Sequence, residues 1–319
     1  MPANRSKAEK RLKSTERILL RDRPLAQKYC ETTEGYIAKR YERKLTPEEE
    51  TKAEEKQLFL PHHPVTNPNK PGKVRIIMDA AAKCDNVSLN NKLLIGPDLL
   101  NNLVGVLLRF RQERVAIGAD IEAMFHQCAV IKEDQPALRF LWRNLKCEQP
   151  PEVYQMLVMI FGAASSPCTA NYILRKTADD NRQDPMFSPE AIKAVKENFY
   201  MDDLLKSVKD DATAIRLQKE LTNLLSKGGF RLTKWSSSSR NVLAEIPDKE
   251  KASPSIDLDF DDLPIERSLG LKWNTETDCF RFSVSLRSTA ASKRGVLSQV
   301  SSVSTPLVYS RLLRYQQNV

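Results

Sequence analysis

The chain has 319 residues, a formal net charge of +9 and 41% apolar residues, enough for the core of one large domain or of two to three ordinary ones. No apolar run is long enough to cross a membrane and no secretory signal peptide is evident, so we expect no membrane partner and an intracellular, cytoplasmic location. The six cysteines form no Cys-X-X-Cys pair, which excludes a zinc motif of that type and a disulfide framework.

The positive charge is concentrated at the two ends of the sequence. Residues 1–28 carry nine Lys or Arg against three acids, and six basic residues with no acid follow Asp278. A basic protein suits a nucleic-acid partner, because contacts to phosphates and the release of counterions supply much of such binding. Solvated tails are an equally good interpretation of the first 28 residues.

The first predicted elements are charged helices and a hairpin. Residues 1–57 are polar and lysine-rich, which favours charged helices or partial disorder. Thr46 followed by Pro47 is typical of a helix start, because threonine caps the helix and proline suits its first turn. Residues 58–79 predict a long hairpin. Its turn is expected at residues 67–72, where Asn, Pro and Gly are typical turn residues.

The second strand of this hairpin carries three charged residues that are separated by even numbers of positions. Lys73, Arg75 and Asp79 share parity, so they are expected to project from one face of the strand. An ion pair between Arg75 and Asp79 on this strand face is an alternative role for the arginine.

The middle of the chain alternates helices and strands. In chain order the patterns predict a helix over 98–112, a buried strand over 115–121, a helix from Ser166 and Pro167, a hairpin over 198–207, a helix from Asp210 or Asp211 to Gly228, and a strand over 230–235. This order predicts an α+β fold, in which a sheet is covered by two helices on one face. Asp120, near the end of the first strand, is then expected to meet the tip of the hairpin.

Two adjacent carboxylates mark that tip. Asp202 and Asp203 lie between two apolar runs, and neighbouring carboxylates repel each other. A cation that binds both would offset this cost, and Mg²⁺ suits a few carboxylates together with water and substrate phosphates. The hypothesis is phosphoryl transfer on a nucleotide by two metal ions. The simpler alternative is an exposed acidic turn.

Several ordered motifs resemble those of a known family. Ala119–Gln127, Phe161–Pro167 and Tyr200–Asp203 are similar to the three ordered palm motifs of reverse transcriptases. Further stretches resemble the BEL/Pao class of LTR retrotransposon polyproteins, and these are Pro61–Asp79, Gly229–Trp235 and Leu269–Trp273. The likeness extends from about Gly35 to about Val303, which makes it far more specific than one pair of acids.

The resemblance implies a right-hand polymerase of the α+β class, with fingers, palm and a partial thumb, whose palm is an antiparallel sheet backed by two helices. The implied parts are a charged N-terminal segment (1–57), mainly fingers (58–114), a palm with interleaved fingers at about 132–160 (115–247), an acidic linker (248–266), and a primer-grip hairpin with an incomplete thumb (267–319). The implied activity is RNA-directed DNA synthesis, in which a primer 3′-hydroxyl is extended with deoxynucleotides. RNA and DNA primer–template and deoxynucleoside triphosphates are the implied partners.

The metal site follows from the same resemblance. Asp120, Asp202 and Asp203 match the three metal-binding carboxylates, and the carbonyl of Ile121 is expected to help hold one of two Mg²⁺ ions, with Mn²⁺ as a possible substitute. Lys234 is a candidate for protonating the departing pyrophosphate, although a solvated strand residue is an equally good interpretation.

The nucleotide site is also implied residue by residue. Arg75 matches the fingers arginine that braces the triphosphate, and Lys73 is expected to join it. Phe125, five residues after Asp120, matches the bulky gate that excludes a 2′-hydroxyl. Core filling is the alternative role for this aromatic residue. Residues expected to line the nucleotide, template and primer sites are Phe161, Gly162, Ser166, Pro167, Tyr200, Met201, Leu269, Gly270 and Trp273. For the three tryptophans, core packing is the commoner role.

The end of the sequence departs from the family pattern. Ser292–Val303 still resembles the family, but the expected Tyr-Asp-Pro-Leu-Gly continuation is replaced by Ser304–Val308. This favours a truncated or frame-shifted copy with an incomplete thumb. The competing hypothesis is therefore an inactive retroelement fragment that binds nucleic acid without catalysis, which the retention of all three carboxylates disfavours.

Overall fold

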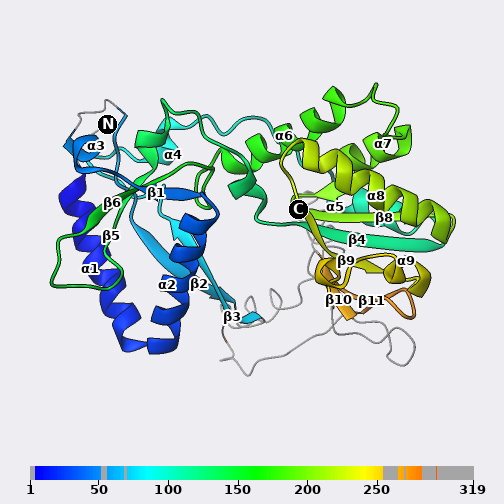
Figure 1. Cartoon of the computed structure of the whole chain (residues 1–319), viewed down its shortest axis with the longest axis horizontal. Helices are drawn as coiled ribbons and strands as arrows, with labels where there is room; N and C mark the ends of the chain where they lie inside the picture. The colour runs from blue at the N-terminus through cyan, green and yellow to red at the C-terminus, as the bar shows by residue number, and fades with distance from the viewer. Residues whose placement is uncertain are drawn as a thin grey trace. The chain divides into compact units, whose positions relative to one another are not determined.

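The protein is described from a computed structural model, which covers residues 4–51, 56–67, 70–253, 265–268, 271–281 and 292. The expectations for Leu269, Gly270 and residues 304–319 lie outside this range. The chain forms two compact units, described separately below (Figure 1). Unit 1 comprises Met1–Asp98 and Ala123–Tyr172, and unit 2 comprises Leu99–Glu122 and Ile173–Val319.

Unit 1 combines N-terminal helices with two small antiparallel sheets. Its elements are α1 (Arg5–Arg21), α2 (Arg23–Ala38), β1 (Glu42–Lys44), α3 (Pro47–Thr51), β2 (His62–Asn67), β3 (Lys70–Met78), α4 (Leu89–Lys92), the 3₁₀ turns η1 (Met124–Gln127) and η2 (Gln135–Leu138), β5 (Arg139–Trp142), β6 (Glu152–Met156) and the start of α6 (Ser166–Asp180). One sheet has the order β1-β6-β5, and the predicted hairpin is the pair β2-β3. The predicted helix start is also present, because Thr46 caps α3 and Glu49 completes the capping box.

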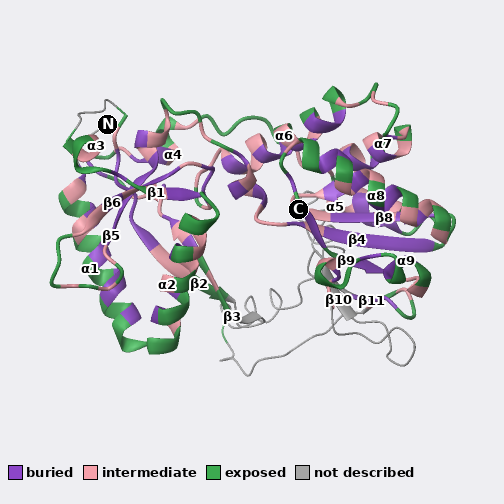
Figure 2. Cartoon of the chain, in the orientation of Figure 1, coloured by how far each residue is buried: buried purple, intermediate pink, exposed green. Residues whose placement is uncertain are grey.

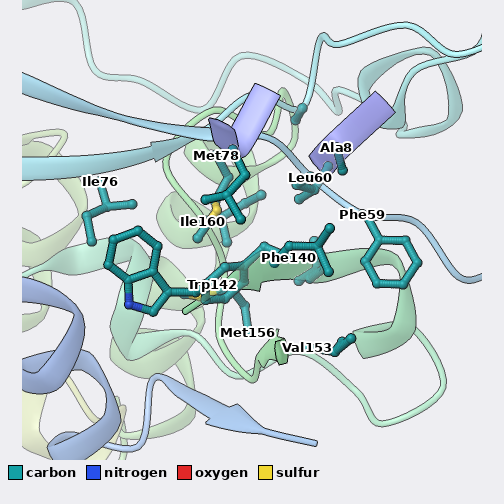
Figure 3. Close-up of a cluster of buried hydrophobic side chains, with 14 of the residues drawn as sticks. Ala8, Phe59, Leu60, Ile76, Met78, Phe140, Trp142, Val153, Met156 and Ile160 are labelled. Atoms are coloured by element: carbon teal, nitrogen blue, oxygen red, sulfur yellow. The ribbon is translucent and has the colours of Figure 1, made fainter. Parts of the chain in front are cut away.

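The charged N-terminus is helical and belongs to the core of unit 1. Ala8, Leu12 and Leu19 of α1 are buried, in a cluster that includes Phe140 and Trp142 of β5 (Figure 3). On the same side of α1, the Glu16 carboxylate receives two hydrogen bonds, at 2.7 and 2.6 Å, from Arg143. The side chains of this pair are only 2% and 8% exposed. The prediction of charged helices is therefore correct for residues 5–38, and the alternative of partial disorder is wrong for these residues.

Unit 2 is built on a four-stranded antiparallel sheet with the strand order β7-β8-β4-β9, and it also carries a three-stranded antiparallel sheet with the order β10-β11-β12. Its elements are α5 (Leu103–Phe110), β4 (Val115–Ile121), α7 (Pro189–Glu197), β7 (Phe199–Tyr200), β8 (Asp203–Val208), α8 (Asp211–Lys227), β9 (Leu232–Ser237), α9 (Arg240–Ala244), the 3₁₀ turn η3 (Asp248–Glu250), β10 (Ile265–Ser268), β11 (Leu271–Asn274) and β12 (Cys279–Arg281). Strands β4 and β8 are largely buried (Figure 2).

Helices α8 and α7 contact this sheet and each other. Asp210 caps α8 by accepting a hydrogen bond from the amide of Thr213, and the helix ends at Gly228, as predicted. Leu217, Leu221 and further leucines of its inner face are buried. Mixed helix and antiparallel sheet confirm the α+β class. Helix α7, which contacts β7, was not predicted.

The helix expected over 98–112 is shorter, because α5 begins only after Asn102. The Asn102 side chain accepts a hydrogen bond from the amide of Gly105 and so caps the helix. Leu108, placed on the apolar face by the sequence pattern, is 65% exposed. Val106 and Phe110 instead pack in a cluster with Trp273 of β11. No helix in the described ranges is long and apolar enough to cross a membrane.

Candidate active site

Three aspartates lie at one end of the sheet of unit 2. Asp120 of β4 stands directly opposite Asp203 of β8 in the antiparallel ladder. Asp202 precedes β8, and its carbonyl accepts a hydrogen bond of 2.8 Å from the amide of Ile121. Met201, at φ 55°, makes the tight turn between β7 and β8 possible. The predicted meeting of Asp120 with the hairpin tip is therefore confirmed at the level of the backbone.

Lys234 contacts one of these acids directly. Its Nζ lies 2.7 Å from Oδ2 of Asp120, with side chains 47% and 26% exposed. Lys234 is thus an exposed strand residue, as one of the two interpretations expects, and its ammonium group also pairs with a carboxylate of the candidate site.

A β-bulge explains this contact. Thr233 stands opposite Asp120 while Ser236 stands opposite Gly118, so two residues of β9, Lys234 and Trp235, face one residue of β4. Lys234 adopts φ 54°, in the left-handed region that glycine favours. The extra residue redirects the lysine towards Asp120 while Trp235 is buried with 1% exposure.

The donor atoms at this edge suit a hard divalent cation. Aspartate carboxylates and backbone carbonyls are the oxygen ligands that Mg²⁺ and Mn²⁺ take in proteins. In the described ranges, however, no group of three or more His, Cys, Asp or Glu side chains converges as a ready metal site. Asp120, Asp202 and Asp203 therefore share an edge of the sheet, and their convergence on metal ions belongs to the proposal below.

The predicted nucleotide residues Arg75, Phe161 and Phe125 of unit 1 form a row of contacting side chains. The guanidinium of Arg75, on β3, lies 5.7 Å from the ring centroid of Phe161. The ring of Phe125, which is half-buried, lies 4.9 Å from that of Phe161. Lys73 is exposed two residues before Arg75 on the same strand.

The alternative pairing of Arg75 with Asp79 is wrong. Oδ2 of Asp79 lies 3.1 Å from a guanidinium nitrogen of Arg11, on α1. Asp79 follows the last residue of β3, where its amide donates a hydrogen bond to the carbonyl of Pro61. The carboxylate is consequently turned towards α1, and Arg75 stacks on Phe161 instead.

The segment that carries Phe161 is fixed by its glycine. Gly162 has φ 116°, and a Cβ there would lie 2.1 Å from the carbonyl oxygen of Met78. The amide of Met78 donates to the carbonyl of Phe161 at 3.1 Å, and Asn90 donates to the carbonyl of Gly162 at 3.1 Å. This close approach of two backbones requires glycine and sets the position of the Phe161 ring.

Ser166 has a different role from the one that its position in the sequence indicated. It is fully buried, and its hydroxyl donates to the carbonyl of Ile160 at 2.8 Å instead of capping α6. Pro167 does occupy the first turn of α6. Ser166 therefore holds the loop before the helix, which leads directly to Phe161.

Several residues beside this row were missed by sequence reasoning. His126 packs edge-on against Phe161 at 5.1 Å and against Tyr36 at 4.9 Å. Burial lowers the pKa of His126 to about 4, so the ring is neutral at physiological pH. Gln127 donates to the hydroxyl of Tyr41 at 3.0 Å. The only available signal was that His126 and Gln127 directly follow Phe125 in the sequence.

Trp273 is a core residue and not an exposed primer contact. It is 1% exposed, and its indole N–H donates to the carboxylate of Asp278 at 2.8 Å. Its ring packs edge-on against Phe110 at 5.0 Å. Among the expected primer contacts, Tyr200 ends β7 and Met201 forms the turn, at the edge that carries the carboxylates.

Comparison with solved structures gives matches of low similarity. A foamy viral protease-reverse transcriptase dRH in complex with double-stranded DNA has a TM-score of 0.45 and 16% identity, covering 62% of this chain and 28% of that one. The structure of the foamy viral protease-reverse transcriptase in complex with double-stranded DNA has a TM-score of 0.43 and 17% identity, covering 63% of this chain and 34% of that one. The structure of the same protein in complex with an RNA/DNA hybrid has a TM-score of 0.40 and 15% identity, covering 55% of this chain and 20% of that one. The chain thus spans about a third or less of these proteins.

A search of curated proteins finds no match. The sequence profile of the family described as "Reverse transcriptase (RNA-dependent DNA polymerase)" matches residues 66–236, more than half of the chain. The matched segment contains β3, the Phe161 loop and the sheet edge that carries the three aspartates. The chain therefore belongs to the reverse transcriptase (RNA-dependent DNA polymerase) family.

Proposed function

We propose that the chain is the RNA-directed DNA polymerase region of a retrotransposon, which extends a primer 3′-hydroxyl with deoxynucleotides. The observation that carries this proposal is the pairing of Asp120 with Asp203 at a sheet edge, beside Asp202, in a chain of the reverse transcriptase family. The motifs of residues 61–79, 229–235 and 269–273 favour the BEL/Pao class. RNA and DNA strands and deoxynucleoside triphosphates are the proposed partners.

Asp120, Asp202 and Asp203 would hold two divalent ions, with the carbonyl of Ile121 as a further ligand. When bound, such ions lower the cost of deprotonating the primer hydroxyl and neutralise charge on the triphosphate. Because these acids lie on neighbouring strands, the ladder between β4 and β8 sets the spacing of two of them. The protein therefore supplies a fixed arrangement of oxygen ligands.

Lys234 offsets the negative charge of the Asp120 carboxylate and is the proposed source of a proton for the departing pyrophosphate. In the structure its ammonium group is paired with Oδ2 of Asp120. A cation bound by Asp120 would compete with this ammonium group, which would then be released towards the leaving group. The bulge in β9 keeps the lysine within reach of the site in either case.

Arg75 and Lys73 would bind the triphosphate, and Phe125 would select its sugar. The stacking of Arg75 on Phe161 orients the guanidinium before any phosphate arrives, which lowers the entropy lost on binding. Phe161 also supports the Phe125 ring, so that one aromatic side chain positions both groups. A rigid ring beside the sugar would clash with a 2′-hydroxyl.

Primer extension on an RNA template tests the proposal. The purified chain should extend a DNA primer with deoxynucleotides when Mg²⁺ is supplied, and chelation should stop the reaction reversibly. Asp202→Asn should abolish extension, whereas the control Asp180→Asn, an exposed acid paired with Lys176 on α6, should leave it unchanged. Extension that persists in Asp202→Asn would refute the assignment of the site. Nucleic-acid binding by the wild-type chain without any extension would support the inactive fragment instead.

A further inference from the structure

We propose that the outer face of α1 is a second nucleic-acid-binding surface, made of residues other than those of the candidate active site, which holds a strand through its phosphate backbone. The surface consists of Lys10, Lys13, Arg17 and Arg21, called the basic stripe below. The inference rests on the proposed function only for its choice of nucleic acid as the partner. It concerns residues that lie outside the segment matched by the family profile.

The geometry of the helix aligns these four cations. At about 100° per residue, positions 10, 13, 17 and 21 fall within a sector of roughly 80°. Ser6 and Ser14 are polar residues of this outer face, and all six are exposed; Leu20, which is 55% exposed, lies at its border next to Lys13. The opposite face carries the buried residues of α1, including Leu12, Glu16 and Leu19. The exposed face of an amphipathic helix is therefore basic along its whole length, with no acid among its residues.

The acids of this region are all engaged elsewhere. Glu9 pairs with Arg5 at 3.5 Å, Glu16 pairs with Arg143 inside the core, and Asp22 caps α2. Two further cations of α1, Lys7 and Arg11, pair with Asp85 and Asp79. Within the described ranges, the four members of the basic stripe have no ion pair, so their charge remains available to a partner.

The stripe is held in place by the rest of unit 1. Like charges at i,i+4, such as Lys13 with Arg17 and Arg17 with Arg21, each destabilise a helix by about 0.2–0.5 kcal/mol. The opposite face offsets this cost, because Thr15 donates to the carbonyl of His62 and Asn4 exchanges two hydrogen bonds with the backbone of Phe59. The cations are consequently presented on a docked helix and not on a solvated tail.

A phosphate backbone fits this arrangement better than a lipid surface does. From Lys10 to Arg21 the helix rises about 17 Å, which corresponds to about five nucleotides at 3.4 Å each. A helix that binds in a membrane interface must insert its apolar face, and the apolar face of α1 is already buried in unit 1. Besides Ile18 and Leu20, which are 56% and 55% exposed, the exposed surface of α1 offers cations and serines, which suit phosphate oxygens.

The test uses a variant in which all four cations are replaced by glutamine, which keeps helix propensity. Lys10→Gln, Lys13→Gln, Arg17→Gln and Arg21→Gln are combined in the full chain, and far-UV circular dichroism verifies folding. The control removes the same charge from unit 2, by replacing the exposed Lys193, Lys209, Lys219 and Lys249 with glutamine. Binding of a 30-nucleotide single-stranded RNA is measured by fluorescence anisotropy across a salt series.

The logarithm of the association constant falls as the logarithm of the salt concentration rises. In the stripe variant this negative slope should become shallower by about 2–3, since each single-strand phosphate contact contributes about 0.7. At 0.1 M salt, Kd should rise by up to about 500-fold, while the control should change it less than about threefold. A stripe variant with an unchanged slope, or a control with an equal effect, would overturn the proposal. So would a loss of binding to phosphatidylserine vesicles without any loss of RNA binding.

Primer extension at saturating primer–template separates this inference from the proposed function. The stripe variant should keep the wild-type kcat and show a raised KM for primer–template. If the wild-type chain extends primers and the stripe has no effect on binding, the inference fails while the proposed function stands. If the stripe controls RNA binding but no extension occurs, the inference stands and the proposed polymerase activity fails.

Discussion

Gly162 offers the sharpest test of how unit 1 positions the candidate nucleotide site. In Gly162→Ala the added Cβ would lie 2.1 Å from the carbonyl oxygen of Met78. This neighbour is backbone, so no side-chain rotation relieves the contact. The loop must move away from β3, and φ 116° is in addition unfavourable for alanine.

The magnitude follows from the bonds that this movement breaks. Three hydrogen bonds tie the loop to its surroundings, from Met78 to Phe161, from Asn90 to Gly162 and from Ala164 to Asn90. At about 1 kcal/mol each they amount to about 3 kcal/mol, and the backbone conformation adds about 1–3 kcal/mol. The expected destabilisation is about 4–6 kcal/mol, a large part of the 5–15 kcal/mol that is typical of a domain.

Hydrogen exchange of β3 peptides across a urea series measures this loss for unit 1 alone. Gly35→Ala is the matched control, because a Cβ at this position in α2 meets nothing within 4 Å. The control should stabilise unit 1 by about 0.5–1 kcal/mol, since alanine is the better helix former. A Gly162→Ala protein within about 1 kcal/mol of the wild type would refute the reasoning.

Three further predictions concern burial, charge and sugar selection. Glu16→Gln should destabilise unit 1 by about 3–5 kcal/mol in urea unfolding, because it leaves Arg143 buried without its partner, whereas Glu31→Gln in an exposed pair should leave the urea midpoint unchanged. Burial raises the pKa of Glu42 from 4.5 to about 8, so the folded state retains a proton that the unfolded chain loses, and stability should fall as pH rises from about 5 to 8. Glu42→Gln should flatten this dependence between pH 5 and pH 9, and an identical pH profile in the variant would contradict it. Phe125→Ala should increase ribonucleotide incorporation, and unchanged sugar selection would show that this ring is not the gate.

The sequence predicted those features that depend on local signals. The cap at Asp210 and the stop at Gly228 delimit α8 correctly, because both act within one turn of the helix. The turn at Met201 and Asp202 lies between two apolar runs, so the hairpin was visible as well. The pairing of Asp120 with that hairpin followed from the order of strands and helices.

The features that were missed depend on long-range register. The bulge at Lys234 arises only when β9 pairs with β4, and nothing in the local sequence of β9 marks it. Similarly, α1 is fixed by a pair in which Glu16 and Arg143 are 127 residues apart. The sequence left two roles open for Trp273, a primer contact and a core residue. Only its packing with α5 in the folded protein shows that it is a core residue.

The most direct test of the central claim is a double-mutant comparison of Asp120 and Asp203 in primer extension on an RNA template. Asp120→Asn and Asp203→Asn should each lower the single-turnover rate at least about 100-fold, because both acids are proposed to hold the same pair of ions. The double variant should be no more than about threefold slower than the slower single variant, since groups that act as a unit are not additive. Wild-type rates in either single variant would contradict the account, and so would independent, multiplicative losses in the double variant.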